Sequence, residues 1–121
     1  MTAKTRRVLS WLLAAAWAGV IFYASSRPGS TIPGGYSVEG HLGEYFVFGV
    51  LLAFALGEGR PTVRFALIAI ALASLYGVTD ELHQHFTPGR MPDPADWALD
   101  TVGATAGAFA LVAWNRWRAR G

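Results

Sequence analysis

Residues 8–26 read VLSWLLAAAWAGVIFYASS, and no charged side chain interrupts them. A helix needs about 20 consecutive, mostly apolar residues to cross a bilayer, and this block reaches that length unaided. A surface helix of a soluble protein carries a polar stripe along one side, which this block lacks. The stretch therefore predicts a membrane-spanning helix.

Three further apolar blocks follow, and each becomes long enough to span a bilayer once its polar end is included. The chain of 121 residues is 53% hydrophobic and only 15% charged, below the roughly 25% charged residues of a typical soluble domain. We therefore predict an all-α, polytopic membrane protein that forms a four-transmembrane-helix bundle. Its single domain covers residues 1–121, with helices at about 8–26, 38–57, 63–85 and 94–115.

The basic residues predict how these helices are oriented, because lysine and arginine accumulate on the cytoplasmic side of membrane proteins. Most of them precede the first predicted helix, separate the second from the third, or follow the fourth: Lys4, Arg6, Arg7, Arg60, Arg64, Arg116, Arg118 and Arg120. Only Arg27 and Arg90 lie in the other two connections. We expect a multi-pass protein of the cell membrane with both termini cytoplasmic. Its partner is the lipid bilayer, and nothing in its charge indicates nucleic acid.

The first helix has an alternative interpretation as a secretory signal, since basic residues precede an apolar core. That core is longer than the roughly 7–15 residues usual in signals, and three more apolar blocks follow. We expect the helix to be retained, with cleavage before Ser26 as the alternative. The chain has no cysteine, so disulfides, a thiol nucleophile and thiolate metal ligands are excluded.

Polar side chains open the second predicted helix. The spacing of His41, Glu44 and Tyr45 places all three on one helical face. Glu44 alone is explained by the helix dipole, which favours an acid in the first turn. His41 and Tyr45 alone are explained by placement at the membrane interface. Together the three are candidates for a functional site.

The third predicted helix ends with two adjacent acids, Asp80 and Glu81, where the helix dipole disfavours negative charge. Such a pair needs a compensating partner, a bound cation or protonation. Gln84 shares a face with Asp80, and Arg90 is the nearby cation. A functional site and a purely structural ion pair with Arg90 both fit this pattern.

The fourth predicted helix begins with Asp93 as a candidate N-cap and Pro94 at its first position. Capping also explains Asp96. Asp100 lies one turn deeper, where inserting an aspartate costs up to roughly 2.5–3.5 kcal/mol. We expect Asp100 to face a partner or a wet cavity, with a snorkelling surface acid as the alternative. Three helices thus bring polar groups to one side of the membrane, which predicts a shallow, outward-facing polar pocket.

Other kinds of site receive little support. The histidines and acids do not reproduce the H-E-x-x-H helix signature, so we predict no metal and no cofactor. Ser25 and Ser26 offer hydroxyl groups on the same side, but no Ser-His-Asp arrangement is readable from their spacing. Gly103 and Gly107 form a G-x-x-x-G motif, which lets two helices approach closely in lipid. We expect this packing within the monomer, while dimerisation and the oligomeric state stay open.

Four segments together resemble the VanZ-like family of small membrane proteins: FYASSRPG, HLGEYFVFG, DELHQHFTPGR and DWALDTVGATAG, within residues 22–107. Their order is similar to the family pattern H-x-x-x-Y, then D-E-x-x-Q with a following P-G-R, then D-x-x-x-N-x-x-G-x-x-x-G. The resemblance implies these polar positions: His41, Tyr45, Asp80, Glu81, Gln84, Arg90 and Asp96. Asp100 stands where the family usually has Asn, and Val38 where many members have Lys. The resemblance also implies an association with glycopeptide-antibiotic resistance.

Three functions fit these observations. The first is a non-enzymatic envelope protein that binds a lipid-linked or glycopeptide-like ligand, with Tyr45, Gln84, Arg90, Asp96 and Asp100 as binding residues. The second is a membrane-embedded hydrolase or transferase, with Asp80 or Glu81 as the base and His41 as a proton donor. The third is a structural module, in which the polar residues only hold the helices together. The sequence favours the first and leaves enzymatic activity open.

Overall fold

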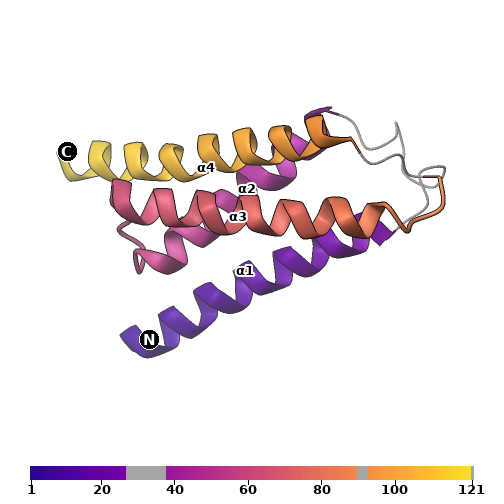
Figure 1. The fold of residues 1–121 in the computed structure, drawn as a ribbon. Helices are drawn as coiled ribbons and strands as arrows, with labels where there is room; N and C mark the ends of the chain where they lie inside the picture. Colours follow the sequence, from indigo (N-terminus) through magenta and orange to yellow (C-terminus); the bar gives the residue numbers. More distant parts are fainter. Residues whose placement is uncertain (27–37, 90–92, 121) are drawn as a thin grey trace.

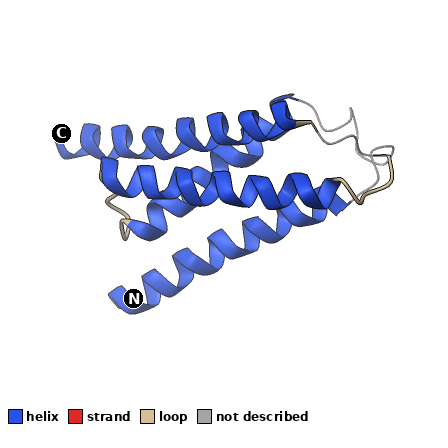
Figure 2. Cartoon of the chain, in the orientation of Figure 1, coloured by secondary structure: helices blue, strands red, loops and turns tan. Residues whose placement is uncertain are grey.

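The computed structural model describes residues 1–26, 38–89 and 93–120, and it is helical in four segments. These are α1 (Ala3–Ser26), α2 (Val38–Leu56), α3 (Val63–Gln84) and α4 (Pro94–Arg120), with no strand among the described residues. All four are long and apolar enough to cross a membrane. The predicted all-α bundle of four spanning helices is confirmed (Figures 1 and 2).

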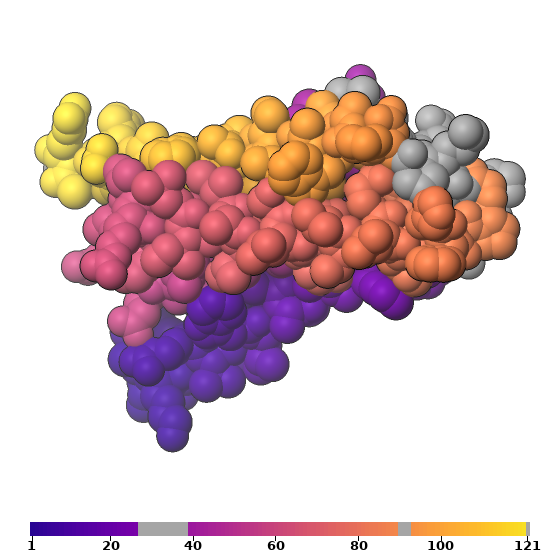
Figure 3. Space-filling view, viewed as in Figure 1, coloured from indigo at the N-terminus to yellow at the C-terminus, as the bar shows by residue number. Residues whose placement is uncertain are grey.

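The helices pack as a three-helix unit with α1 attached at one end. The closest pairing joins α2 and α4, and α3 packs mainly on α4. α1 contacts α2 and α3 but not α4, and towards its N-terminus it diverges from the bundle (Figures 1 and 3). Both chain termini lie at the same end of the molecule, where α2 is connected to α3 (Figure 1). The opposite end carries the polar residues of α2, α3 and α4.

Glycines account for the close approach of α2 and α4. A Cβ atom on Gly103 would lie 2.5 Å from the carbonyl oxygen of Leu42, and one on Gly107 would overlap the carbonyl oxygen of Phe46. From the other side, a Cβ on Gly49 would overlap the backbone of Ala104. The G-x-x-x-G motif therefore packs within the monomer, as expected.

The core consists largely of small side chains, and many large apolar side chains face outwards. Fully buried positions are largely alanines: Ala53, Ala66, Ala69, Ala73, Ala104 and Ala108. In contrast, Leu13 of α1, Leu75 of α3 and Trp117 of α4 are each at least 60% exposed. Lipid tails are as apolar as leucine, so helices in a bilayer associate through small residues and close packing instead. This distribution fits a bundle surrounded by lipid.

Two helices extend beyond their apolar blocks. α1 begins at Ala3 rather than near residue 8, because the Thr2 hydroxyl accepts a hydrogen bond from the backbone N–H of Thr5 at 3.1 Å and caps the helix. α4 continues to Arg120, past residue 115, and carries Arg118 and Arg120 in its last turn, where the dipole favours cations. The predicted start of α4 holds, since Asp93 Oδ1 accepts the backbone N–H of Ala95 at 3.0 Å.

Candidate functional site

A buried histidine–aspartate pair joins α2 to α4. His41 Nδ1 lies 2.7 Å from Asp100 Oδ1, and both side chains are only 1% exposed. The other ring nitrogen, His41 Nε2, lies 3.7 Å from Asp96 Oδ2, and the Asp96 side chain is 27% exposed. Asp100 therefore points inwards at a partner and does not snorkel. The two aspartates bracket the imidazole, one inside the bundle and one at its edge.

The close glycine packing between α4 and α2 explains why the His41–Asp100 pair forms. Gly103 presses on the backbone of Leu42, which is the neighbour of His41. Asp100 lies three residues before Gly103 and so shares its helical face. The close approach of the two helices therefore carries the Asp100 carboxylate onto the imidazole ring.

The third helix adds a second carboxylate to this buried cluster. Asp80 is 4% exposed, and the hydroxyl of the fully buried Tyr45 donates to Asp80 Oδ2 at 3.4 Å. Gly77, one turn earlier on α3, allows the helix to approach α4, because a Cβ there would lie only 3.2 Å from Trp97 Cδ1. His41, Tyr45, Asp80 and Asp100 thus form one buried polar cluster across α2, α3 and α4.

Gln84 belongs to a different contact. Its Nε2 donates to Ser25 Oγ at 3.3 Å, and the Thr87 hydroxyl donates to the Ser25 carbonyl oxygen at 3.1 Å. Ser25 is fully buried. These bonds tie the end of α1 to the end of α3, so they hold the bundle together at the level of the cluster.

Ser26, the other candidate hydroxyl, pairs with His83 near the end of α3. Ser26 Oγ lies 2.8 Å from His83 Nε2 and also donates to the carbonyl oxygen of Phe22 at 2.7 Å. The Phe22 ring stacks on the His83 ring with centroids 4.4 Å apart. Among the residues with described positions, no carboxylate pairs with His83. A Ser-His-Asp triad is therefore not assembled there.

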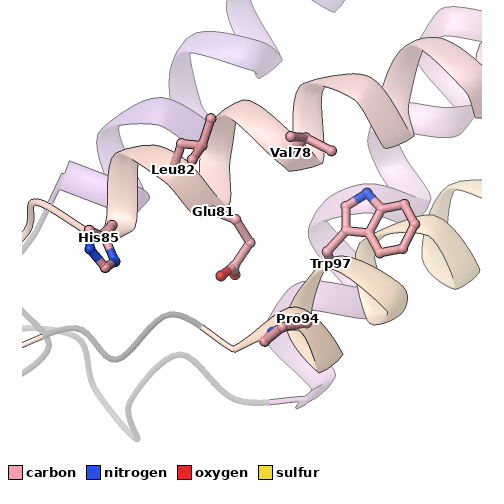
Figure 4. Close-up of a pocket in the computed structure, with 6 residues that line it drawn as sticks. All are labelled: Val78, Glu81, Leu82, His85, Pro94 and Trp97. Atoms are coloured by element: carbon pink, nitrogen blue, oxygen red, sulfur yellow. The ribbon is translucent and has the colours of Figure 1, made fainter.

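Glu81 faces a groove between α3 and α4. This α3–α4 groove has a volume of about 390 Å³ and is lined by Val78, Glu81, Leu82, His85, Pro94 and Trp97 (Figure 4). The Glu81 carboxylate projects from α3 towards the start of α4 (Figure 4), where it forms a hydrogen bond with the backbone of Asp93. Its Oε1 is buried and has no hydrogen-bond partner among the described residues. Neither His41 nor Asp100 lines the groove.

The predicted site residues thus separate into groups. His41, Tyr45, Asp80 and Asp100 form the buried cluster, Asp96 lies at its edge, Glu81 lines the groove and Gln84 binds α1. Arg90, Arg27 and the first loop lie outside the described residues. Within the described ranges, no group of three or more His, Asp or Glu side chains is arranged around a metal position.

The groove itself was missed by the sequence analysis. Val78 and Leu82 look like ordinary lipid-facing residues of an apolar helix, and Trp97 looks like an interfacial anchor. The Trp97 indole N–H donates to the carbonyl oxygen of Ser74 at 3.0 Å, which fixes the ring beside α3. The sequence feature that could have indicated this groove is Trp97, which lies three residues after Pro94 at the start of the fourth helix.

The fold and the site define a small polytopic helical membrane protein with its histidines and most of its acids gathered at one end of its spans. The family model described as VanZ/LLP1 matches residues 10–115, and the chain belongs to that family. The predicted resemblance is confirmed. No curated protein and no solved structure matches the chain.

Proposed function

We propose that this protein binds an envelope amphiphile, a lipid-linked or glycopeptide-like molecule, at the polar end of its bundle. The observation that carries the proposal is the buried cluster of His41, Tyr45, Asp80 and Asp100. Ionisable groups within membrane spans are costly and usually mark functional sites. A buried ion pair is often replaceable by apolar residues without loss of stability, so packing alone does not account for the cluster.

The accessible part of the site lies outside the buried cluster, at the same end of the bundle. Asp96 is partly exposed and lies beside His41, and Glu81 lines the open groove. His41 lies 3.7 Å from the Asp96 carboxylate, and the Asp96 and Glu81 carboxylates are the groups placed to contact a ligand. The link to antibiotic resistance comes only from the family. It is the reason for choosing a glycopeptide-like molecule as a probe.

The proposal requires the polar end to face away from the cytoplasm of the cell membrane. The positive-inside rule supports this orientation, because the basic residues gather at the end that holds both termini. The chain has no native cysteine, so single-cysteine variants report topology directly. We expect an impermeant maleimide to label Asp93→Cys in intact cells. Glu58→Cys, in the connection after α2, will react only after permeabilisation. The reverse pattern contradicts the orientation.

Ligand binding is tested with a lipidated glycopeptide and an isoprenyl-linked saccharide as probes, using protein in nanodiscs. We expect one of them to bind, and the Asp96→Asn, Glu81→Gln double variant to weaken its binding by at least about tenfold, equivalent to roughly 1.4 kcal/mol. Glu39→Gln is the matched control, since this exposed acid opens α2 outside the cluster. Equal affinities of wild type and double variant, or no binding of either probe, rule out this function.

The His41–Asp100 pair also favours a second function, a hydrolase or transferase. A carboxylate that holds one imidazole nitrogen fixes the tautomer and orientation of the ring for proton transfer. If the protein is such an enzyme, it will cleave a lipid phosphate or peptide bond, and water (for a hydrolase) or a second acceptor (for a transferase) will take up the transferred group. His41→Gln will then abolish turnover while ligand affinity changes little. If a probe binds tightly but is not turned over, the result supports ligand binding without catalysis.

A further inference from the structure

The α3–α4 groove has the form of a site for an alkyl chain. Its volume of about 390 Å³ lies within the roughly 300–1,000 Å³ of typical ligand pockets. Val78, Leu82, Pro94 and Trp97 make most of its wall apolar, and it lies where α3 ends and α4 begins (Figure 4). The exposed faces of Val78 and Leu82, at 44% and 62%, place the groove on the outside of the bundle. A chain held in the bilayer therefore reaches it from the side.

The charge of the groove indicates which headgroup the bound alkyl chain carries. Glu81 is the acidic residue of the lining, and its buried Oε1 has no hydrogen-bond partner among the described residues. The surrounding end of the bundle is rich in acids: Glu39, Glu44, Asp80, Asp93, Asp96 and Asp100. Even with Arg27 and Arg90 counted, acids outnumber arginines and lysines at this end. Such a surface repels anionic headgroups and attracts cations.

Trp97 adds a second feature that favours a cation. Its ring forms one wall of the groove and is held by the bond to Ser74 (Figure 4). The face of an indole attracts ammonium groups. An apolar groove with a carboxylate and an indole in its lining matches an ammonium group on an alkyl chain.

We propose that the α3–α4 groove binds the alkyl chain of an ammonium-bearing membrane amphiphile, and that Glu81 is the counter-ion of its ammonium group. This inference rests on the proposed function and names the class of ligand. It differs from a site for lipid phosphates, for which an acidic groove is unsuited. The partly exposed Asp96 would contact the remaining polar part of the same molecule.

The test uses two photoreactive probes, a dodecylammonium and a dodecyl sulfate, each with a diazirine in the chain. Wild-type protein in phosphatidylglycerol nanodiscs is labelled with each probe, and the labelled residues are mapped by mass spectrometry. We expect the ammonium probe to label residues 78–97 about tenfold more than the sulfate probe. Glu81→Gln will remove that preference and leave labelling by the chain itself.

A second pair of variants tests whether labelling depends on the groove itself. Val78→Trp fills the groove and will remove labelling by both probes. Leu75→Trp, one turn earlier on the lipid-facing side of α3 and outside the groove lining, will leave it unchanged. Equal labelling by the two probes, or labelling insensitive to both Glu81→Gln and Val78→Trp, overturns the inference. If the glycopeptide or saccharide probe still binds through Asp96 in that case, the proposed function stands and only the groove assignment fails.

Discussion

Replacing Gly107 by alanine will push α4 away from α2 and destabilise the whole bundle. The added methyl group would overlap the carbonyl oxygen of Phe46, which belongs to the backbone of a helix and cannot turn aside as a side chain would. Overpacking of a well-packed core costs about 1–3 kcal/mol, and we expect a value at the top of that range. The measurement is the free energy of unfolding in mixed micelles, obtained by titration with a denaturing detergent.

Two other glycines supply the matched controls for Gly107→Ala. A Cβ atom on Gly19 of α1 or Gly43 of α2 would meet nothing within 4 Å. Alanine is the better helix former by about 0.5–1 kcal/mol, so both control variants will be as stable as the parent or slightly more stable. If Gly107→Ala is as harmless as Gly43→Ala, α2 and α4 are not packed as described.

Removing the Asp100 carboxylate will have the second-largest effect. Asp100→Ala leaves a buried imidazole without the acceptor that now lies 2.7 Å from Nδ1, and His41 is 1% exposed. Breaking a buried pair by removing one partner costs about 3–5 kcal/mol when both groups are charged, and about 1–3 kcal/mol when a neutral polar group is left unsatisfied. We therefore expect a loss of about 3 kcal/mol in the same unfolding assay.

Three companion variants separate the pair from its surroundings. Asp100→Asn keeps an acceptor oxygen at the position where the family usually has asparagine, and it will cost less than about 1 kcal/mol. The His41→Leu, Asp100→Leu double variant replaces both partners by apolar groups and will be more stable than Asp100→Ala. Asp96→Ala removes a partly exposed carboxylate 3.7 Å from the ring and will change stability by less than about 1 kcal/mol. Additive effects of His41 and Asp100 substitutions would show that the two residues do not interact.

Much of the fold was predictable because it depends on properties of single segments. Length and apolar composition decide whether a segment can span a bilayer, and the four spans followed from them. Helical spacing placed His41 with Tyr45, and Asp96 with Asp100, on shared faces. The cap at Asp93 and the close packing of Gly103 and Gly107 also depend on local spacing, and the structure confirms both.

The site was only partly predictable because it depends on how the helices are rotated about their axes. The sequence placed Asp80, Glu81, Asp96 and Asp100 on the same side of the membrane as His41 but did not indicate which of them contacts it. The structure brings Asp100 to 2.7 Å, keeps Asp96 at 3.7 Å and turns Glu81 into the groove. Adjacent residues on a helix point about 100° apart, so Asp80 faces the core while Glu81 does not.

The sequence by itself determined that this chain has four membrane-spanning helices and gathers most of its acids at one end. It also indicated the family, because the motifs and their spacing can be read from the sequence without coordinates. Only the tertiary structure decided which acid pairs with His41 and that a groove opens beside Glu81. The physical reason is that the glycine contacts between α2 and α4 set the rotation and separation of those helices, and such contacts exist only once distant segments have packed.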